Sequence, residues 1–105
     1  MVRRDHAKDP IVALTKTGFR IGDSEFDWNS VMTIRVFKLD LVTWDEIRFS
    51  FNLASGRTLE VSEEQPGFSE FVAELERRYP AAGGWQAKVV QPAFARNEVV
   101  LWQRS

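Results

Sequence analysis

The sequence predicts an α+β domain in which a curved antiparallel sheet, or a partly open barrel, packs with one main helix. One long segment, residues 66–79, repeats its apolar residues at helical spacing. The segments before and after it are shorter, alternate apolar with polar residues, and are separated by short turn signals. Short turns connect neighbouring strands in antiparallel hairpins. A chain of 105 residues has the length of a single domain.

The main helix is expected over residues 66–79 and ends before Pro80, which pushes the preceding residue out of the helical region. Pro66 suits a first turn, where its missing N–H costs little. Glu74 and Arg78 are placed to pair at i, i+4. One stripe about 100° wide faces the core. It contains Phe68, Phe71, Val72, Leu75 and Tyr79.

Six short strands are expected before the helix, at residues 11–14, 19–21, 25–28, 31–39, 46–53 and 58–61. Gly18 is expected in a left-handed turn. The strand at 31–39 carries apolar residues on both faces, which is typical of a central strand. The strand at 46–53 alternates cleanly, with Ile47, Phe49, Phe51 and Leu53 inward. Residues 40–45 are expected to form a loop.

After the helix, residues 98–102 are expected to form a last strand, rich in β-branched residues. The pattern leaves open whether residues 85–95 are helical or extended. We expect a curved sheet of about six strands in all. The chain divides into a flexible N-terminal tail at residues 1–9, which is polar and aperiodic, and a single α+β domain at residues 10–105.

Composition places the chain in the ordinary globular class, with 44% hydrophobic and 28% charged residues. The net charge is −1, so we expect no nucleic-acid partner. There is no cysteine, no signal-peptide pattern and no apolar run long enough for a membrane span. We therefore expect a cytoplasmic protein.

No residue pattern points to catalysis, a cofactor or a metal ion. The single histidine, His6, lies in the polar tail, so no serine or threonine has a structured base beside it. The acidic residues lack the spacing of a calcium loop, and no glycine-rich phosphate loop opens a helix. We predict no catalytic, cofactor or metal residues.

Four tryptophans are open to two interpretations, as core fillers or as a binding surface. Trp28, Trp85 and Trp102 lie in or beside ordered segments and are assigned to the core. Trp44 lies among acids in the expected loop. Asp40, Trp44 and Asp45 are therefore the predicted binding residues.

Several stretches resemble a known family. They are W-N-S-V before a long strand, F-K-L-D, W-D-E-I-R-F-S-F, S-E-E-Q-P-G-F, and P-A-F-A-R-N-E-V-V-L-W near the end. Together they are similar to a family of small uncharacterised bacterial proteins with a PH-like, strongly bent antiparallel sheet. The resemblance covers most of residues 10–103. The chain departs from a true PH domain in two ways. A true PH domain ends on its long helix, whereas here about 25 residues follow the helix, and the multi-basic signature of phosphoinositide-binding PH domains is missing.

The resemblance implies a PH-like fold and brings no activity with it. The leading hypothesis is a small non-catalytic protein-binding or scaffold domain, with an unidentified protein partner; homo-oligomerisation stays open. The alternative is a peripheral lipid- or small-ligand-binding domain, for which Lys16 and Arg20 are the basic candidates. Two basic residues do not support stable membrane binding. An enzyme of unknown reaction is the third hypothesis.

Overall fold

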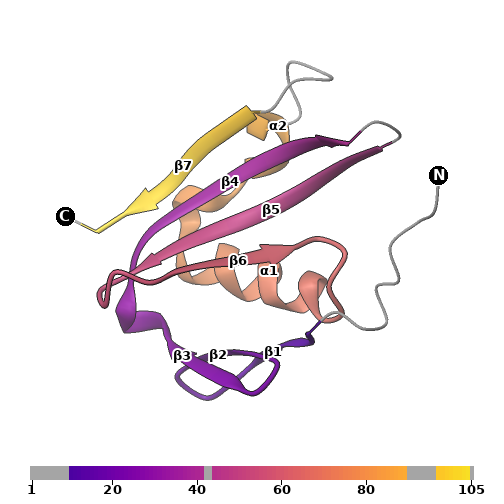
Figure 1. Cartoon of the computed structure of the whole chain (residues 1–105). Coiled ribbons are helices and arrows are strands. Elements are labelled where there is room, and N and C mark those ends of the chain that lie inside the picture. Colours follow the sequence, from indigo (N-terminus) through magenta and orange to yellow (C-terminus); the bar gives the residue numbers. More distant parts are fainter. Residues whose placement is uncertain (1–9, 42–43, 90–96, 105) are drawn as a thin grey trace.

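The computed structural model describes residues 10–41, 44–89 and 97–104 of the chain (Figure 1). The predicted tail at residues 1–9 lies outside the described residues. No helix among the described residues is long and apolar enough to cross a membrane. The elements are β1 Val12–Leu14, β2 Gly18–Ile21, β3 Ser24–Asp27, η2 Trp28–Ser30, β4 Val31–Leu41, β5 Trp44–Leu53, β6 Thr58–Ser62, α1 Phe68–Arg78, η3 Pro80–Ala82, α2 Trp85–Val89 and β7 Asn97–Gln103.

The strands form two antiparallel sheets, one of order β1-β2-β3 and one of order β6-β5-β4-β7. The α+β class is confirmed, whereas the expectation of one curved sheet of about six strands is wrong. The break between the sheets is the single 3₁₀ turn η2, which begins where the Asp27 carboxylate accepts a hydrogen bond from the Asn29 N–H at 2.8 Å. Both sheets are open, and they do not close into a barrel.

Helix α1 covers one face of the four-stranded sheet, so that β6 crosses in front of it in Figure 1. Its predicted stripe is confirmed: Phe71, Val72 and Leu75 are buried, and Phe68 and Tyr79 pack against the same core. The sheet contributes Ile34, Val36, Ile47, Phe49, Phe51, Leu53, Leu59 and Val61 to this core. The strand at β4 is central, as expected, because it pairs with both β5 and β7.

The helix begins at Phe68, two residues later than expected, so Pro66 precedes it. The reason is Gly67, whose φ of 90° cannot continue into a right-handed helix. A Cβ atom at Gly67 would also lie 1.9 Å from the carbonyl oxygen of Val12. The same turn holds β1 in place, because the Val12 N–H donates to the Pro66 carbonyl at 2.9 Å.

Gly18 plays a different part from the one expected. Its φ is not positive, and it is the first residue of β2 rather than part of a left-handed turn. A Cβ atom at this position would lie 1.8 Å from the carbonyl oxygen of Phe26 on β3. Gly18 is therefore required by the close approach of two strands.

The assignment of three tryptophans to the core is confirmed. Trp28 and Trp85 are buried, and Trp102 is partly buried against the core. Trp28 stacks on Phe71 with ring centroids 5.7 Å apart. Trp85 opens the short helix α2, which settles the helical reading for residues 85–89; residues 90–95 lie outside the described part of the chain.

Candidate functional site

The predicted binding residues lie at the end of the longest hairpin. The loop expected at residues 40–45 is wrong in extent, because β4 runs to Leu41 and β5 begins at Trp44. Long apolar and β-branched side chains on both strands favour continued pairing up to the turn. The register places Asp40 opposite Asp45 and Leu41 opposite Trp44. The structure thus brings the three predicted residues into two adjacent rungs of one ladder.

This end of the hairpin extends past its neighbours. Strand β6 pairs with β5 only from Arg48 onward, and β7 pairs with β4 only as far as Lys38. In the described structure, residues 39–41 and 44–46 have strand partners only in each other; we call these residues the hairpin arm. Figure 1 shows β4 and β5 continuing beyond the end of β6. Both outer edges of the arm therefore carry backbone groups that β6 and β7 do not pair.

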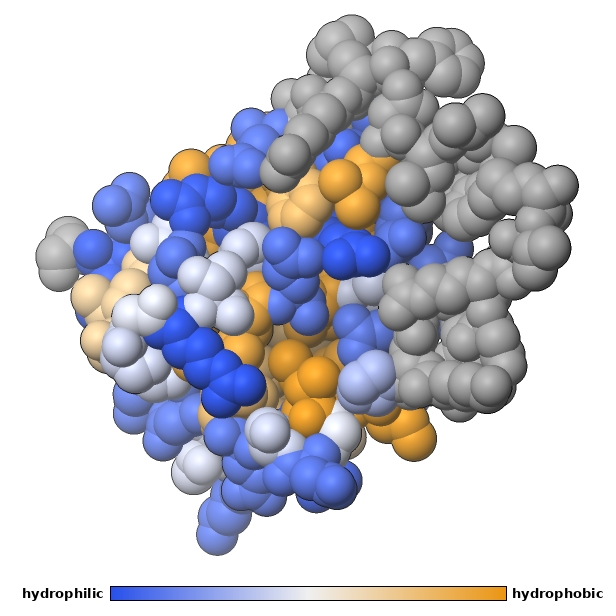
Figure 2. Space-filling view, viewed as in Figure 1, coloured by the Kyte–Doolittle hydropathy of each residue, from blue (hydrophilic) through white to orange (hydrophobic). Residues whose placement is uncertain are grey.

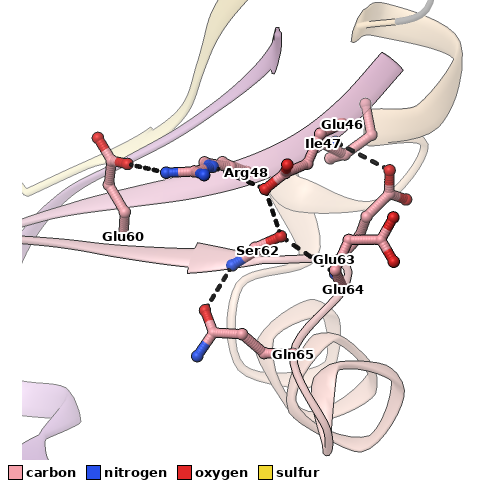
Figure 3. A network of polar contacts seen from close by, with 8 residues as sticks. All are labelled: Glu46, Ile47, Arg48, Glu60, Ser62, Glu63, Glu64 and Gln65. Atoms are coloured by element: carbon pink, nitrogen blue, oxygen red, sulfur yellow. Dashed lines mark hydrogen bonds and ion pairs between the residues drawn. The ribbon is translucent and has the colours of Figure 1, made fainter. Parts of the chain in front are cut away.

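A second polar site was missed by the sequence analysis and lies beside the arm (Figure 3). On the face of the sheet turned away from α1, Arg48 lies between two carboxylates. Its Nε donates to Glu46 Oε2 at 2.9 Å, and its Nη1 donates to Glu60 Oε1 at 3.0 Å. Ser62 donates its hydroxyl hydrogen to the same Glu46 oxygen at 2.6 Å. These four side chains form the Arg48 network.

Burial makes the Arg48 network more than a surface salt bridge. Glu46 is 3% exposed, and Ser62 is 5% exposed. Burial alone would lower the pKa of Arg48, but the hydrogen bonds and charges of Glu60 and Glu46 outweigh it and raise the pKa. The guanidinium is therefore held in its charged form, and the buried Glu46 carboxylate has the partners that burial requires.

The same network organises the turn that leads into α1. The Glu63 carboxylate accepts a hydrogen bond from the Ile47 N–H at 2.9 Å, and the Ser62 hydroxyl oxygen accepts one from the Glu64 N–H at 3.1 Å. The Gln65 side-chain oxygen accepts a hydrogen bond from the Ser62 N–H at 2.8 Å, and Gln65 Nε2 donates to the Pro10 carbonyl at 2.9 Å. These bonds fix β6, the turn and the start of β1 relative to one another.

A depression of about 220 Å³ opens beside this network. Its walls are polar on the β6 side and apolar on the β1–β2 side. They are formed by Pro10, Ile21, Arg48, Glu60, Ser62 and Gln65. Figure 2 shows this face of the molecule, where hydrophilic residues surround apolar ones. The depression can accept a side chain that is apolar along its length and polar at its tip.

The sequence held a signal for this site. Glu46 and Arg48 are two residues apart on one strand, and Glu60 and Ser62 are two apart on the next, so each pair shares a face. The tight turn at residues 54–57 sets the register that places Arg48 opposite Ser62 and Ser50 opposite Glu60. The register that follows from the length of this turn therefore predicts that the four side chains of the Arg48 network lie together.

The basic pair considered for anionic lipids lies elsewhere. Arg20 is exposed on β2 and lies directly opposite Glu25 of β3 in the register. A shallow depression of about 500 Å³ next to it is lined by Ile11, Arg20, Gly22 and Asp23. Arg20 is thus accompanied by two acids, Glu25 and Asp23, whereas Lys16 lies in the preceding turn. The exposed Ile11 is the apolar residue of this depression.

Residues 10–41, 44–89 and 97–104 contain no group of three or more His, Cys, Asp or Glu side chains placed to hold a metal ion. His6 lies outside them. No protein-family model matches the chain, and neither a curated protein nor a solved structure matches it. The resemblance to PH-like proteins stays a prediction.

Proposed function

We propose that this chain is a small non-catalytic domain that binds a partner protein through the hairpin arm. The observation that carries the proposal is the extension of β4 and β5 past β6 and β7. The two outer edges of the arm are paired by neither β6 nor β7, so their backbone groups can bond to another chain.

The residues on the arm favour a partner of a particular character. Trp is the residue type most enriched at the centres of protein interfaces, and Trp44 occupies one rung. Asp40 and Asp45 occupy the next rung. Two acids next to Trp44 favour a partner that carries basic groups. We therefore expect a partner surface with an apolar pocket and a basic rim.

The test is site-specific photo-crosslinking in a lysate of the native host. A photoreactive phenylalanine analogue replaces Trp44 in one variant. In the matched control it replaces Ala73, which is exposed on the outer side of α1. We expect a discrete adduct from position 44 that is absent from position 73 and is competed away by excess unmodified protein. Adducts of equal yield from both positions, or none from position 44, would contradict the proposal.

Once the adduct is identified, the purified partner gives a quantitative test. Truncating an interface hot spot costs about 2 kcal/mol or more, so Trp44→Ala should weaken binding by about thirtyfold. Ala73→Gln is the matched surface control and should leave the affinity unchanged. The two residues lie on different elements, so a change in both affinities would indicate a loss of folding rather than of contact.

The PH-like fold and the cytoplasmic location belong to the same proposal, and both rest on the sequence. The bent antiparallel arrangement, with α1 across one sheet, supports a PH-like domain, although the open sheets and the strand β7 after the helix depart from that pattern. The absence of cysteine supports residence in the cytoplasm.

A further inference from the structure

Strand β6 forms one edge of the four-stranded sheet, and its backbone bonds show which of its groups face outward. In an antiparallel pair, alternate residues point both backbone groups at the partner strand, and the residues between them point both groups away. The Leu53 N–H donates to the Arg57 carbonyl at 2.9 Å, and the Glu63 N–H donates to the Ile47 carbonyl at 2.9 Å. These two bonds fix the alternation along the whole strand.

The register then assigns each residue of β6. Leu59 and Val61 face β5 with both backbone groups, because they are an even number of residues from Arg57 and Glu63. Thr58, Glu60 and Ser62 point their N–H and C=O groups away from β5. Ser62 is capped, since its N–H donates to Gln65 Oε1 at 2.8 Å and its carbonyl accepts from the Gln65 N–H at 3.0 Å.

Two residues of the edge stay open. No backbone partner for the outward groups of Thr58 or Glu60 occurs within the described residues, and both residues are exposed. The open stretch is bounded by the Gln65 cap at one end. At the other end Arg57 closes it, with its guanidinium 5.3 Å from the centre of the Phe26 ring. Four backbone groups, two donors and two acceptors, are therefore available to a short extended peptide.

The depression described above adjoins this open stretch. A residue paired with Glu60 places its side chain on the same face as Glu60, next to Pro10 and Ile21. Glu60 uses Oε1 for Arg48 and has a 46% exposed side chain, so Oε2 remains for a second donor. Glu46 lies on the other side of Arg48, where it accepts hydrogen bonds from Arg48 and Ser62.

We propose that the open edge of β6 is a docking site for an extended segment of a partner protein that carries a lysine or arginine opposite Glu60. The segment adds to the sheet beside Thr58 and Glu60. The aliphatic part of its basic side chain lies against Ile21 and Pro10, and its cation reaches Glu60. This site is separate from the hairpin arm, and either can fail without the other.

The test is an NMR titration of the full-length protein at an ionic strength of about 0.15 M. The probe is a blocked heptapeptide of alternating threonine and valine with lysine at its centre; the matched control peptide has glutamate there. The lysine peptide should shift the amide resonances of Thr58 and Glu60 saturably. It should bind about fivefold more tightly than the glutamate peptide, the ratio expected when one cross-strand charge pair is favourable.

Two variants separate backbone pairing from charge. Glu60→Pro removes the outward N–H without removing a bond to β5, and should abolish the shifts at Thr58. Glu60→Thr keeps the N–H and removes the charge, so it should retain binding and lose the preference for the lysine peptide. Either variant is first checked for an unchanged spectrum at the core residues.

The proposal is overturned if neither peptide shifts the amide resonances of Thr58 and Glu60 saturably at peptide concentrations up to about 10 mM. A dissociation constant of that size corresponds to a binding free energy of roughly 3 kcal/mol. It is also overturned if the glutamate peptide binds better. Shifts that depend on protein concentration without peptide would show that a second copy occupies the edge instead. Shifts confined to the hairpin arm would support the proposed function and reject this site.

Discussion

Gln65 closes one end of the β6 edge by bonding to both outward backbone groups of Ser62. Its Oε1 accepts from the Ser62 N–H at 2.8 Å, and its own N–H donates to the Ser62 carbonyl at 3.0 Å. A residue on a neighbouring strand would make the same two bonds. Gln65 therefore takes the place of a further strand at Ser62 and leaves Glu60 and Thr58 without one, which has a direct consequence for substitutions by proline.

Proline should be tolerated at Glu60 and rejected at Leu59. The Glu60 N–H faces away from β5. The free energy of unfolding of Glu60→Pro should therefore lie within about 1 kcal/mol of that of Glu60→Thr. The Leu59 N–H faces β5, so Leu59→Pro should cost about 2 kcal/mol more than Leu59→Ala, which loses only the side chain. Urea denaturation of the four variants measures both differences. Equal penalties at the two positions would show that the assigned alternation is wrong.

Ser62 should matter to stability because its hydroxyl bonds to a buried carboxylate. Ser62→Ala removes the hydrogen bond from the Ser62 hydroxyl to Glu46 Oε2, and a hydrogen bond to a charged group contributes about 1.5–3 kcal/mol. We expect a loss of that size in the free energy of unfolding. Ser69→Ala, on the exposed side of α1, is the control and should stay within about 0.5 kcal/mol. Equal effects of the two substitutions would contradict a buried network.

Periodicity predicted the elements well where one rule decides the pattern. The strand at β5 alternates without a break and the stripe of α1 repeats without a gap. In both cases the apolar residues are buried or pack against the core, as expected. The hydrophobic core alone fixes such patterns. Two polar residues of β5 differ from this pattern. Glu46 and Ser50 lie on its outer face, where alternation predicts exposed side chains, and both are buried.

The features that were missed depend on contacts between distant residues. Gly18 looked like a turn glycine, but the constraint comes from Phe26 on another strand. Residues 40–45 looked like a loop because acids are rare in strands, yet the pairing of β4 with β5 continues through Asp40 and Asp45. The Arg48 network requires the register of two strands, which alternation in one strand does not give. The contact role of Asp40, Trp44 and Asp45 stays a prediction.

Leu75 lies at the centre of the α1 stripe and is 0% exposed. Leu75→Ala should therefore cost about 2–5 kcal/mol in the free energy of unfolding, as a core truncation that leaves a cavity. Ala73→Gln, on the exposed face of the same helix, is the matched control and should stay within about 0.5 kcal/mol. A loss below that limit for Leu75→Ala would mean that the stripe does not pack on the sheet.

Glu74 should give α1 a pH-dependent contribution. Hydrogen bonds from Arg77 and then Arg78 hold the pKa of the Glu74 carboxyl below its ordinary value. A lowered pKa in the folded state adds stability above the unfolded pKa of about 4.3, and that stability is lost as pH falls through the folded value.

The stability difference between the protein and Glu74→Gln should therefore be largest near neutral pH and shrink as the pH is lowered below about 4. Because the ion pairs are at the surface, we expect a difference below about 1 kcal/mol. The double variant Arg77→Gln/Arg78→Gln keeps the carboxylate and removes its donors, so NMR titration should show a higher Glu74 pKa there. An unchanged pKa in the double variant would contradict this cause.

The surface around Arg20 should not bind phosphoinositide vesicles or DNA at physiological salt. Each basic residue near an anionic surface contributes about 1 kcal/mol, so Lys16 and Arg20 together supply about 2 kcal/mol, which is weaker than millimolar binding. The acids nearby reduce even this binding free energy, because Glu25 lies opposite Arg20 and Asp23 lines the same depression.

Co-sedimentation with phosphoinositide vesicles at about 0.15 M salt should recover no protein. Asp23→Lys/Glu25→Lys reverses the two acids on the same surface, so it should gain binding and prove the assay sensitive. Saturable micromolar binding of the unmodified chain, lost in Lys16→Glu/Arg20→Glu, would instead favour the peripheral lipid-binding alternative.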